Sequence, residues 1–449
     1  MFRHVGFFSL PTVRHGRNHQ ATRRRFQFDH GPTDRPSGRQ RQTGHVPEPV
    51  SLVPSDDTRP RALSPAEKAL TVKRKDQSSR TDRQVPPMAA PHNLKFGPAD
   101  AFQRELRRRV ERYFATTGRR RRDCPQMYLK TALIFGWFAA SYPTLLFLVE
   151  TWWLALPLAI SLGLSMAAIG FNVQHDGGHR AYSDRPWINR LMAMTLDLLG
   201  GSSYFWAKKH NSIHHSYANI TGHDEDINLG LVARLSPHQQ PLKLHRLQHF
   251  YLWALYGILP IKWQVFDDFR DVVNGRIGGH RLARPKGWDL VTFIAGKMVF
   301  FSLALVIPLL LHPVWAVLLI YGAASFIQGL ALGVVFQLGH CVEEAAFPLP
   351  GQDTGRMART WAAHQVETTV DYARGNRLLS WFIGGLNFQI EHHLFPQICH
   401  VHYPALSPLV EATCREFGVR YVAHDTLLAG VASHFRWLRR MGMAEAADG

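Results

Sequence analysis

Four long apolar stretches dominate the hydropathy pattern of the chain. Residues 131–149 and 152–174 contain no charged side chain and are separated only by Glu150 and Thr151. Residues 290–311 and 314–337 form a second pair, separated by His312 and Pro313, and carry only Lys297, which can extend toward a membrane surface. About 20 apolar residues in a helix cross a bilayer core. The pattern predicts four transmembrane helices arranged as two tight hairpins.

Two further apolar stretches are too short or too polar to span. Residues 187–206 contain Arg190 and Asp197, and residues 247–261 lie between Arg246 and Lys262. Both are predicted to be interfacial helices. An additional span between residues 180 and 286 would put histidines that follow the second and fourth spans on opposite sides of the membrane. A charged amphipathic helix is predicted at 102–114.

The first 87 residues are polar and basic. They hold 17 Lys and Arg against 8 Asp and Glu, which is +9 of the net charge of +18. With no sustained apolar period, residues 1–87 are predicted to be disordered. This stretch could be a nucleic-acid-binding tail, but no interleaved aromatic residues or binding fold accompany its charge. It could also resemble a transit peptide, but its eight acidic residues argue against that. Another reading is that Met88 is the true start, with residues 88–449 forming the membrane domain.

The distribution of basic residues predicts the orientation of the spans. Neither short hairpin connection contains Lys or Arg, whereas Arg119–Arg122 precede the first hairpin and residues 180–286 hold fourteen. The positive-inside rule therefore places both termini and the middle segment in the cytoplasm. The four cysteines exclude a disulfide scaffold and fit a reducing compartment.

Three clusters of histidines lie near the predicted cytoplasmic ends of the spans. The side chains of residues four apart share one face of a helix and can reach one metal ion. Solvated surface histidines are the alternative, but three such clusters in one chain make coincidence a poor explanation. The clusters are His175 and His179; His210, His214 and His215; and His392 and His393, which follow Gln389 by three and four residues.

Seven imidazoles exceed what one metal ion can take, so the clusters indicate two metal ions. Imidazole-rich sites with few thiolates suit iron, zinc, copper or nickel. No cysteine lies inside a cluster, which disfavours a structural zinc site. A metal transporter or sensor is a non-enzyme alternative, but transport sites lie near the bilayer midplane within spans, whereas these clusters lie at span ends.

The three histidine boxes, in this order relative to two hairpins, resemble the membrane fatty acid desaturase family. The resemblance runs from about Met88 to the C-terminus. The third box, Gln389-Ile-Glu-His-His-Leu-Phe-Pro, is the most specific part, and its Gln resembles front-end desaturases and bacterial acyl-CoA desaturases of the linoleoyl-CoA or stearoyl-CoA type. The second box, His210-x-x-x-His214-His215, is the longer of two family variants.

The resemblance implies an all-α integral membrane protein with four transmembrane helices and a cytoplasmic helical cap that holds a di-iron centre. It further implies O2 as co-substrate and an additional histidine ligand after the fourth span, a place that His340 occupies; the alternative is a helix-end histidine facing lipid headgroups. Gln389 is expected to act indirectly or through water. The implied metal ligands are His175, His179, His210, His214, His215, His340, His392 and His393.

Several residues near the boxes are candidates for supporting roles. Carboxylates often hold the second ring nitrogen of a metal-bound histidine. The candidates for this role are Asp176, Asp226, Asp371 and Glu391, and the alternative is that they are solvated charges. His364 either replaces the histidine lost at Gln389 or is a local structural residue.

Other side chains are candidates for contacting the substrate. Tyr204, Phe205 and Trp206 precede the second box and could line an apolar slot or simply pack. Basic residues nearby could bind the phosphates of CoA or lie among lipid headgroups. These are Arg185, Arg190, Lys208 and Lys209.

The chemistry expected from the resemblance is O2-dependent desaturation of an acyl chain on CoA or on a membrane lipid. A hydroxylase on the same scaffold is the alternative enzyme. The chain has no dinucleotide-binding Gly motif, no Cys quartet and no His-Pro-Gly-Gly haem motif. The two electrons are therefore expected from ferredoxin or a cytochrome b5-type donor with an NAD(P)H-dependent reductase. A bacterial plasma membrane and no nucleic-acid partner are expected.

Overall fold

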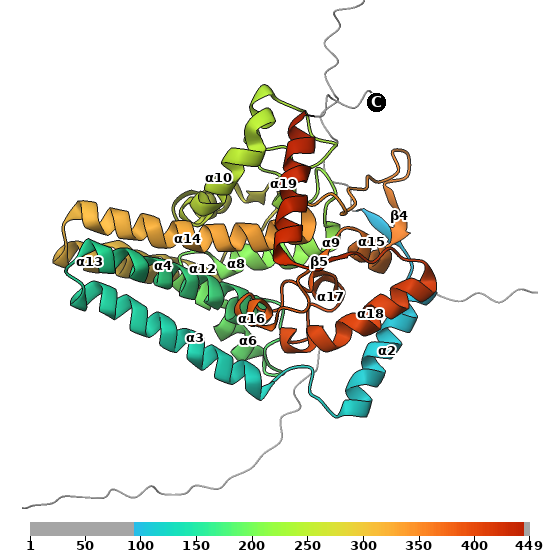
Figure 1. The fold of residues 1–449 in the computed structure, drawn as a ribbon, viewed down its shortest axis with the longest axis horizontal. Coiled ribbons are helices and arrows are strands. Elements are labelled where there is room, and N and C mark those ends of the chain that lie inside the picture. Colours follow the sequence, from blue (N-terminus) through green and yellow to red (C-terminus); the bar gives the residue numbers. More distant parts are fainter. Residues whose placement is uncertain (1–93, 444–449) are drawn as a thin grey trace, which may run out of the picture. The chain divides into compact units, whose positions relative to one another are not determined.

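The computed structural model describes residues 94–443, and this range is mostly helical (Figure 1). The basic extension predicted for residues 1–87 lies outside the described residues. The elements follow in chain order, with π-helical and 3-10 turns labelled η. They are β1 (Lys95–Gly97), α2 (Ala101–Thr117), α3 (Pro125–Pro143), η2 (Thr144–Leu148), α4 (Trp152–Ala168), η3 (Ile169–Gln174), α5 (His175–Gly178), α6 (Pro186–Ala193), α7 (Thr195–Leu198), α8 (Ser203–Trp206), η4 (Ala207–His214), α9 (His215–Tyr217), η5 (Glu225–Ile227), η6 (Lys243–Leu247), α10 (Gln248–Lys262), η7 (Trp263–Asp267), α11 (Asp268–Asn274), β2 (Arg276–Ile277), β3 (His280–Arg281), α12 (Trp288–Phe301), η8 (Ser302–Val306), α13 (Ile307–Leu311), α14 (Val314–His340), β4 (Arg356–Thr360), α15 (Trp361–Glu367), β5 (Asp371–Tyr372), α16 (Arg377–Phe382), α17 (Gln389–Leu394), η9 (His400–His402), α18 (Tyr403–Phe417), β6 (Ala423–His424) and α19 (Leu427–Met443).

Four helices among residues 94–443 are long and apolar enough to cross a membrane, which confirms the four predicted spans. They extend over Pro125–Leu148, Trp152–Gly178, Trp288–Leu311 and Val314–His340. The second and fourth helices continue beyond their apolar stretches, through His175 and to His340 respectively. Both extensions carry histidines out of the apolar segment at the same end of the bundle.

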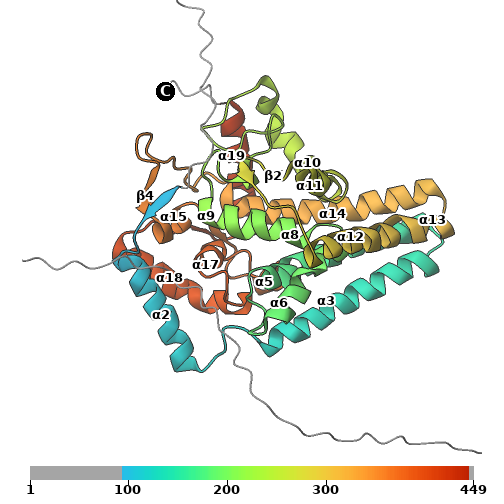
Figure 2. The same cartoon turned by 180° about the vertical axis from the view of Figure 1, so that it is seen from behind.

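The spans pack closely where small residues face a neighbouring backbone. A Cβ atom at Gly163 of α4 would overlap the carbonyl oxygen of Ala324 in α14. A Cβ atom at Gly329 of α14 would likewise overlap the carbonyl oxygen of Tyr256 in α10. Small residues of this kind let membrane helices approach closely. Helix α14 is thereby held between α4 and α10 (Figures 1 and 2).

The two stretches predicted to be interfacial form shorter helices than the spans. Residues 187–206 form α6, α7 and α8, with a break at Gly200 and Gly201, and Gly200 has a φ of 86°. Residues 247–261 correspond to α10, which packs on both α14 and α19. Within residues 94–443, neither stretch is among the four candidate spans.

The predicted amphipathic helix at 102–114 is present as α2. The Asp100 side chain accepts a hydrogen bond of 2.9 Å from the backbone of Gln103 and caps the first turn. Gly118 ends the helix in the left-handed conformation with a φ of 64°. The apolar face of α2 packs on α17 and α18 through Phe102 and Val110. Helix α2 therefore covers the segment that carries the third histidine box.

Strands play a small part in residues 94–443. Strand β1 pairs in parallel with β4, β2 pairs with β3 as an antiparallel hairpin, and β5 pairs in parallel with β6. The β5–β6 pair joins the segment before α16 to the segment before α19 through Asp371 and Ala423. The strands tie loops of the helical cap together.

We predict that Gly329→Ala lowers the free energy of unfolding by about 1–3 kcal/mol, because overpacking forces α10 and α14 apart. Gly322→Ala in the same helix is the matched control, since a Cβ there meets no atom within 4 Å. Thermal unfolding of the purified protein in detergent measures both. Equal melting temperatures for the two variants would contradict the close contact between α10 and α14.

Candidate metal centre

The first histidine box lies at the end of the second span. The helix changes to π-helical geometry over η3 and then forms the short helix α5, which begins at His175 and ends just before His179. Both imidazoles are buried, and their ring centroids are 4.7 Å apart. Such π-helical turns are frequent at functional sites because they redirect side chains by a fraction of a turn.

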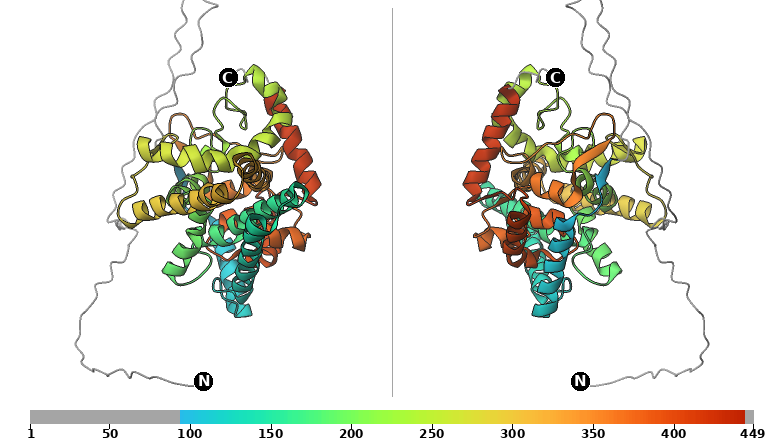
Figure 3. Two further views of the ribbon diagram at one scale, coloured as in Figure 1. Left: turned by 90° about the vertical axis from the view of Figure 1, so that its left-hand side faces the viewer. Right: turned by 90° about the vertical axis from the view of Figure 1, so that its right-hand side faces the viewer.

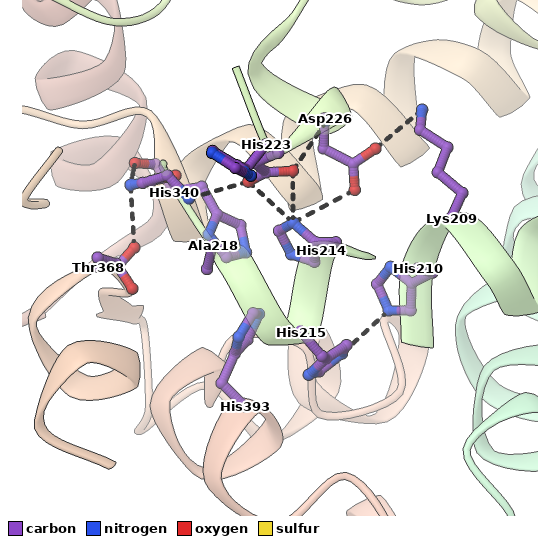
Figure 4. Close-up of polar contacts among 12 residues, drawn as sticks. Lys209, His210, His214, His215, Ala218, His223, Asp226, His340, Thr368 and His393 are labelled. Atoms are coloured by element: carbon purple, nitrogen blue, oxygen red, sulfur yellow. Dashed lines mark hydrogen bonds and ion pairs between the residues drawn. The ribbon is translucent and has the colours of Figure 1, made fainter. Parts of the chain in front are cut away.

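The second box lies on another π-helical segment, η4, and on the following helix α9. The Nε2 atoms of His210 and His215 approach to 3.3 Å. The ring of His214 lies 5.3 Å from that of His210 but closer, at 4.6 Å, to that of His340 at the end of α14. The segment thus presents its three histidines in two directions (Figure 4).

The third box lies on α17, whose residues Gln389–Leu394 are all buried. The ring of His392 lies 4.5 Å from that of His175, and the ring of His393 lies 4.8 Å from that of His340. Neighbouring residues on one short helix therefore point at different members of the cluster.

The histidines form two groups that share no member. Within each group, one candidate ligand atom from every member lies within 4.8 Å of the others. His215 forms a further group with His392 and His393 and so lies between the two. The first group is His175, His179, His210 and His392, and the second is His214, His340 and His393. All eight histidines implied by the sequence come together in one buried cluster.

The cluster leaves ring nitrogens without hydrogen-bond partners in the described part of the chain. These atoms are buried, although buried polar groups in folded proteins are almost always satisfied. Lone pairs that face one another across a few ångströms are what a metal ion requires. The unpartnered atoms include Nε2 of His175, His179, His392 and His393, and Nδ1 of His215 and His340. The residues present fit a metal site.

Burial sets the protonation of these imidazoles. It lowers the pKa of His210, His215, His392 and His393 well below the usual range, and neighbouring histidines lower it further. Neutral imidazole is the form that binds metals. Burial also lowers the pKa of His214, but the carboxylates of Asp224 and Asp226 outweigh it and raise the pKa overall.

Carboxylate and amide side chains orient two of the histidines from outside the cluster. Nδ1 of His214 lies 3.2 Å from both carboxylate oxygens of Asp224 and 3.4 Å from Asp226, which also pairs with Lys209 at 2.9 Å (Figure 4). Nδ1 of His393 lies 2.8 Å from Oε1 of Gln365. Such contacts leave Nε2 free to face a metal.

Asp224 and Gln365 are absent from the residues singled out in the sequence. Asp224 lies two residues before the predicted Asp226, so an acidic pair close behind the second box was the available signal. Gln365 adjoins His364 but follows no motif, and its place becomes visible only when α15 packs on α17.

Three of the four predicted carboxylates have hydrogen-bond partners other than a box histidine. Asp176 lies 2.9 Å from Nδ1 of His400. Glu391 faces the Tyr421 hydroxyl at 3.1 Å, and Asp371 accepts a hydrogen bond of 2.6 Å from the same hydroxyl. The physical reason is helix geometry: Asp176 and Glu391 each adjoin a box histidine in sequence, and adjacent residues on a helix point to different faces.

Gln389 and His364 also have defined partners. Nε2 of Gln389 lies 2.9 Å from Nε2 of His340, so the amide reaches the edge of the second group. Nε2 of His364 lies 3.0 Å from the carbonyl oxygen of Ala218, outside both groups. This contact favours the local structural reading of His364.

Comparison with known proteins identifies the family. A profile of the family described as "Fatty acid desaturase" matches residues 151–424. The chain is 38% identical over 353 residues to an sn-1 linoleoyl-lipid 6-desaturase of Arthrospira platensis, covering 78% of this chain and 94% of that protein. It is 37% identical to an sn-1 linoleoyl-lipid 6-desaturase of Synechocystis sp. (80% and 100% covered) and to an acyl-lipid (8-3)-desaturase of Physcomitrium patens (77% and 72%). The chain belongs to the fatty acid desaturase family. It is therefore an oxidoreductase, a fatty acid desaturase, rather than the hydroxylase or the transporter of the two alternatives.

A cavity of about 1080 Å³ reaches the histidine cluster of the desaturase. Its wall includes His210, His214 and His340, together with aromatic and aliphatic side chains of α8, α10 and α14. Of the three aromatic residues predicted to form a slot, Phe205 and Trp206 line the cavity. The Tyr204 hydroxyl instead donates to the carbonyl oxygen of Ala283.

We predict that Asp224→Asn weakens metal binding roughly 10- to 100-fold, because His214 loses the nearer of the two carboxylates that hold its ring. Anaerobic titration of the full chain with Fe(II), read by bound metal per protein, measures the affinity. Asp271→Asn is the matched control, since Asp271 lines the same cavity but pairs with Arg270 at 2.9 Å. Equal Fe(II) affinity for Asp224→Asn and the unmodified protein would refute the orienting role.

Proposed function

We propose that the eight clustered histidines hold two iron ions and that the chain desaturates acyl groups of membrane lipids. His175, His179, His210 and His392 would hold one ion, and His214, His340 and His393 the other, with His215 between them. The observation that carries this proposal is that candidate ligand atoms converge within 4.8 Å in each group, and that five of these seven histidines have a buried ring nitrogen without a partner in the described residues. The nitrogen-only donor set, free of cysteine, suits iron.

The chemistry requires a metal because an unactivated methylene has no acidic proton. Iron bound at the cluster supplies the one-electron chemistry with O2 that cleavage of such a C–H bond needs. The balanced reaction removes two hydrogens from the acyl chain and combines O2 with two electrons and two protons, giving one double bond and two water molecules. The electrons come from an external carrier.

The side chains of the cavity would position the acyl chain. The ring of Trp206 stacks on that of His210 at 4.6 Å, and Phe336 lies 6.1 Å from the same ring. These aromatic groups form an apolar passage beside the first group of histidines. An apolar wall excludes water from the reacting carbon atoms and keeps the chain extended past the cluster.

The charges that line the cavity favour a lipid substrate over acyl-CoA. Lys209 pairs with Asp226 at 2.9 Å, and Lys262 pairs with Asp267 at 2.6 Å. Arg270 pairs with Asp271 at 2.9 Å, whereas Arg276 makes no ion pair within residues 94–443. Over the whole lining, five carboxylates outnumber these four cations. The phosphates of CoA require cations that are not already neutralised by carboxylates. The names of the relatives as acyl-lipid desaturases agree with this choice.

The proposed orientation places the histidine cluster in the cytoplasm of a bacterium, with the spans in its plasma membrane. The boxes follow the second and fourth spans at one end of the bundle, and the Arg-rich segment before α3 lies at that end too. Excess Lys and Arg marks the cytoplasmic side. The cytoplasm also supplies the proposed donors, ferredoxin or a cytochrome b5-type protein with its NAD(P)H-dependent reductase.

We expect the full chain to produce a new unsaturated fatty acid when it is expressed with ferredoxin and its reductase in a bacterial strain that lacks desaturases. Gas chromatography–mass spectrometry of fatty acid methyl esters detects the product and locates its double bond. The control is His214→Ala, which removes one histidine of the second group and should abolish the product. A hydroxy acid, or a product that His214→Ala leaves unchanged, would contradict the proposal.

A pulse of labelled fatty acid distinguishes the two carriers of the acyl chain. We expect labelled unsaturated acid first in the glycerolipid fraction, with the acyl-CoA pool remaining saturated. Label that turns unsaturated in acyl-CoA before it does so in lipid would overturn the acyl-lipid assignment while leaving desaturation itself intact.

A further inference from the structure

A strongly basic surface of the described cap lies on the outer face of α2. Between residues 101 and 121, seven arginines and one glutamate are exposed. Arg104, Arg107, Arg108 and Arg112 lie on the helix itself, and we call these four residues the α2 arginine face. Arg108 pairs with Glu105. Arg107 and Arg112 make no ion pair within residues 94–443.

The opposite side of α2 leads directly toward the histidine cluster. Val110 and Phe114 pack in one buried group with Tyr403, the first residue of α18. The Tyr403 hydroxyl lies 3.4 Å from Nδ1 of His392. One helix, about 10 Å thick, and one tyrosine therefore separate the α2 arginine face from a member of the first histidine group.

The arrangement of the cap separates this surface from the membrane. The four spans extend to one side, and α2 lies beside α18 at the opposite end of the described residues (Figures 1 and 2). The right-hand view of Figure 3 shows α2, in cyan, from that end. Arg119–Arg121 lie just before the first span and are placed to meet lipid headgroups. That explanation does not extend to Arg104 or Arg107 near the start of α2.

We propose that the α2 arginine face is the docking surface for an acidic one-electron carrier protein. This inference rests on the proposed function, because only a reaction that consumes external electrons needs such a partner. Two reduced carrier molecules are oxidised in turn, each giving one electron across the α2–Tyr403–His392 wall. Complementary charge speeds the encounter of such partners and fixes their orientation.

Binding is tested with the full chain in nanodiscs of phosphatidylcholine, which has no net charge. The probes are a plant-type [2Fe–2S] ferredoxin and the soluble domain of cytochrome b5, both acidic. The test variant is Arg107→Glu with Arg112→Glu. We expect the dissociation constant of the carrier to rise roughly tenfold at low salt, with the difference shrinking at high salt. Biolayer interferometry measures it without any need for turnover.

The matched control is Lys243→Glu with Arg246→Glu, two exposed cations on η6 that also make no ion pair within residues 94–443. This control should bind the carrier like the unmodified protein. In desaturation assays, the test variant should raise KM for the carrier by the same factor and leave kcat unchanged. Equal melting temperatures of both double variants exclude unfolding as the cause.

Three results would overturn the docking surface. The first is unchanged carrier binding by the test variant, and the second is an equal loss of binding in the η6 control. The third is a test variant that loses affinity only for vesicles containing phosphatidylglycerol, which would make the α2 arginine face a lipid contact. Failure of the proposed function gives a different result, namely no unsaturated product from the unmodified protein. The binding comparison does not depend on that product.

Discussion

The burial of eight imidazoles in one place is the constraint on which the structure depends. Each buried ring nitrogen without a partner carries the cost of removing a polar group from water. Several of these nitrogens face one another rather than a protein donor or acceptor. Low pKa values keep most of the imidazoles neutral, so charge repulsion does not scatter them. Such a cluster is stabilised when a metal ion at its centre binds the lone pairs, so this fold is suited to holding a metal.

The scaffold achieves the convergence by extending helices beyond the apolar core. Helix α4 continues through π-helical geometry into the first box, and α14 continues to His340. The glycines of these helices bring their backbones together, since a Cβ at Gly163 would overlap α14. The distance between two histidines 165 residues apart, His175 and His340, thus depends on helix packing inside the membrane. The second and third boxes then close the cluster from the cap side.

The sequence was sufficient for features whose signal is local. Apolar length located the four spans, and regular spacing located the boxes, because both follow from the geometry of a single helix. Contacts made across the fold were not accessible in this way. Asp224 reaches His214 only after the turn that follows α9 folds back, and Asp176 meets His400 from a segment 224 residues away. Lying next to a box histidine in sequence did not predict contact with the histidine cluster, because adjacent residues on a helix point to different faces.

A buried cluster creates a second requirement, which is access for the acyl chain and for electrons. The acyl chain can use the cavity beside Trp206 and Phe336, where carboxylates outnumber the cations of the lining and pair with most of them. Electrons need no channel, but the protein layer that they cross must be thin. The layer formed by α2 and Tyr403 is one helix deep. The two routes meet the cluster from different elements, α8, α10 and α14 for the lipid and α2 with α18 for the electrons. A carrier protein on α2 would therefore not obstruct the lipid, and reduction could proceed while the acyl chain stays bound.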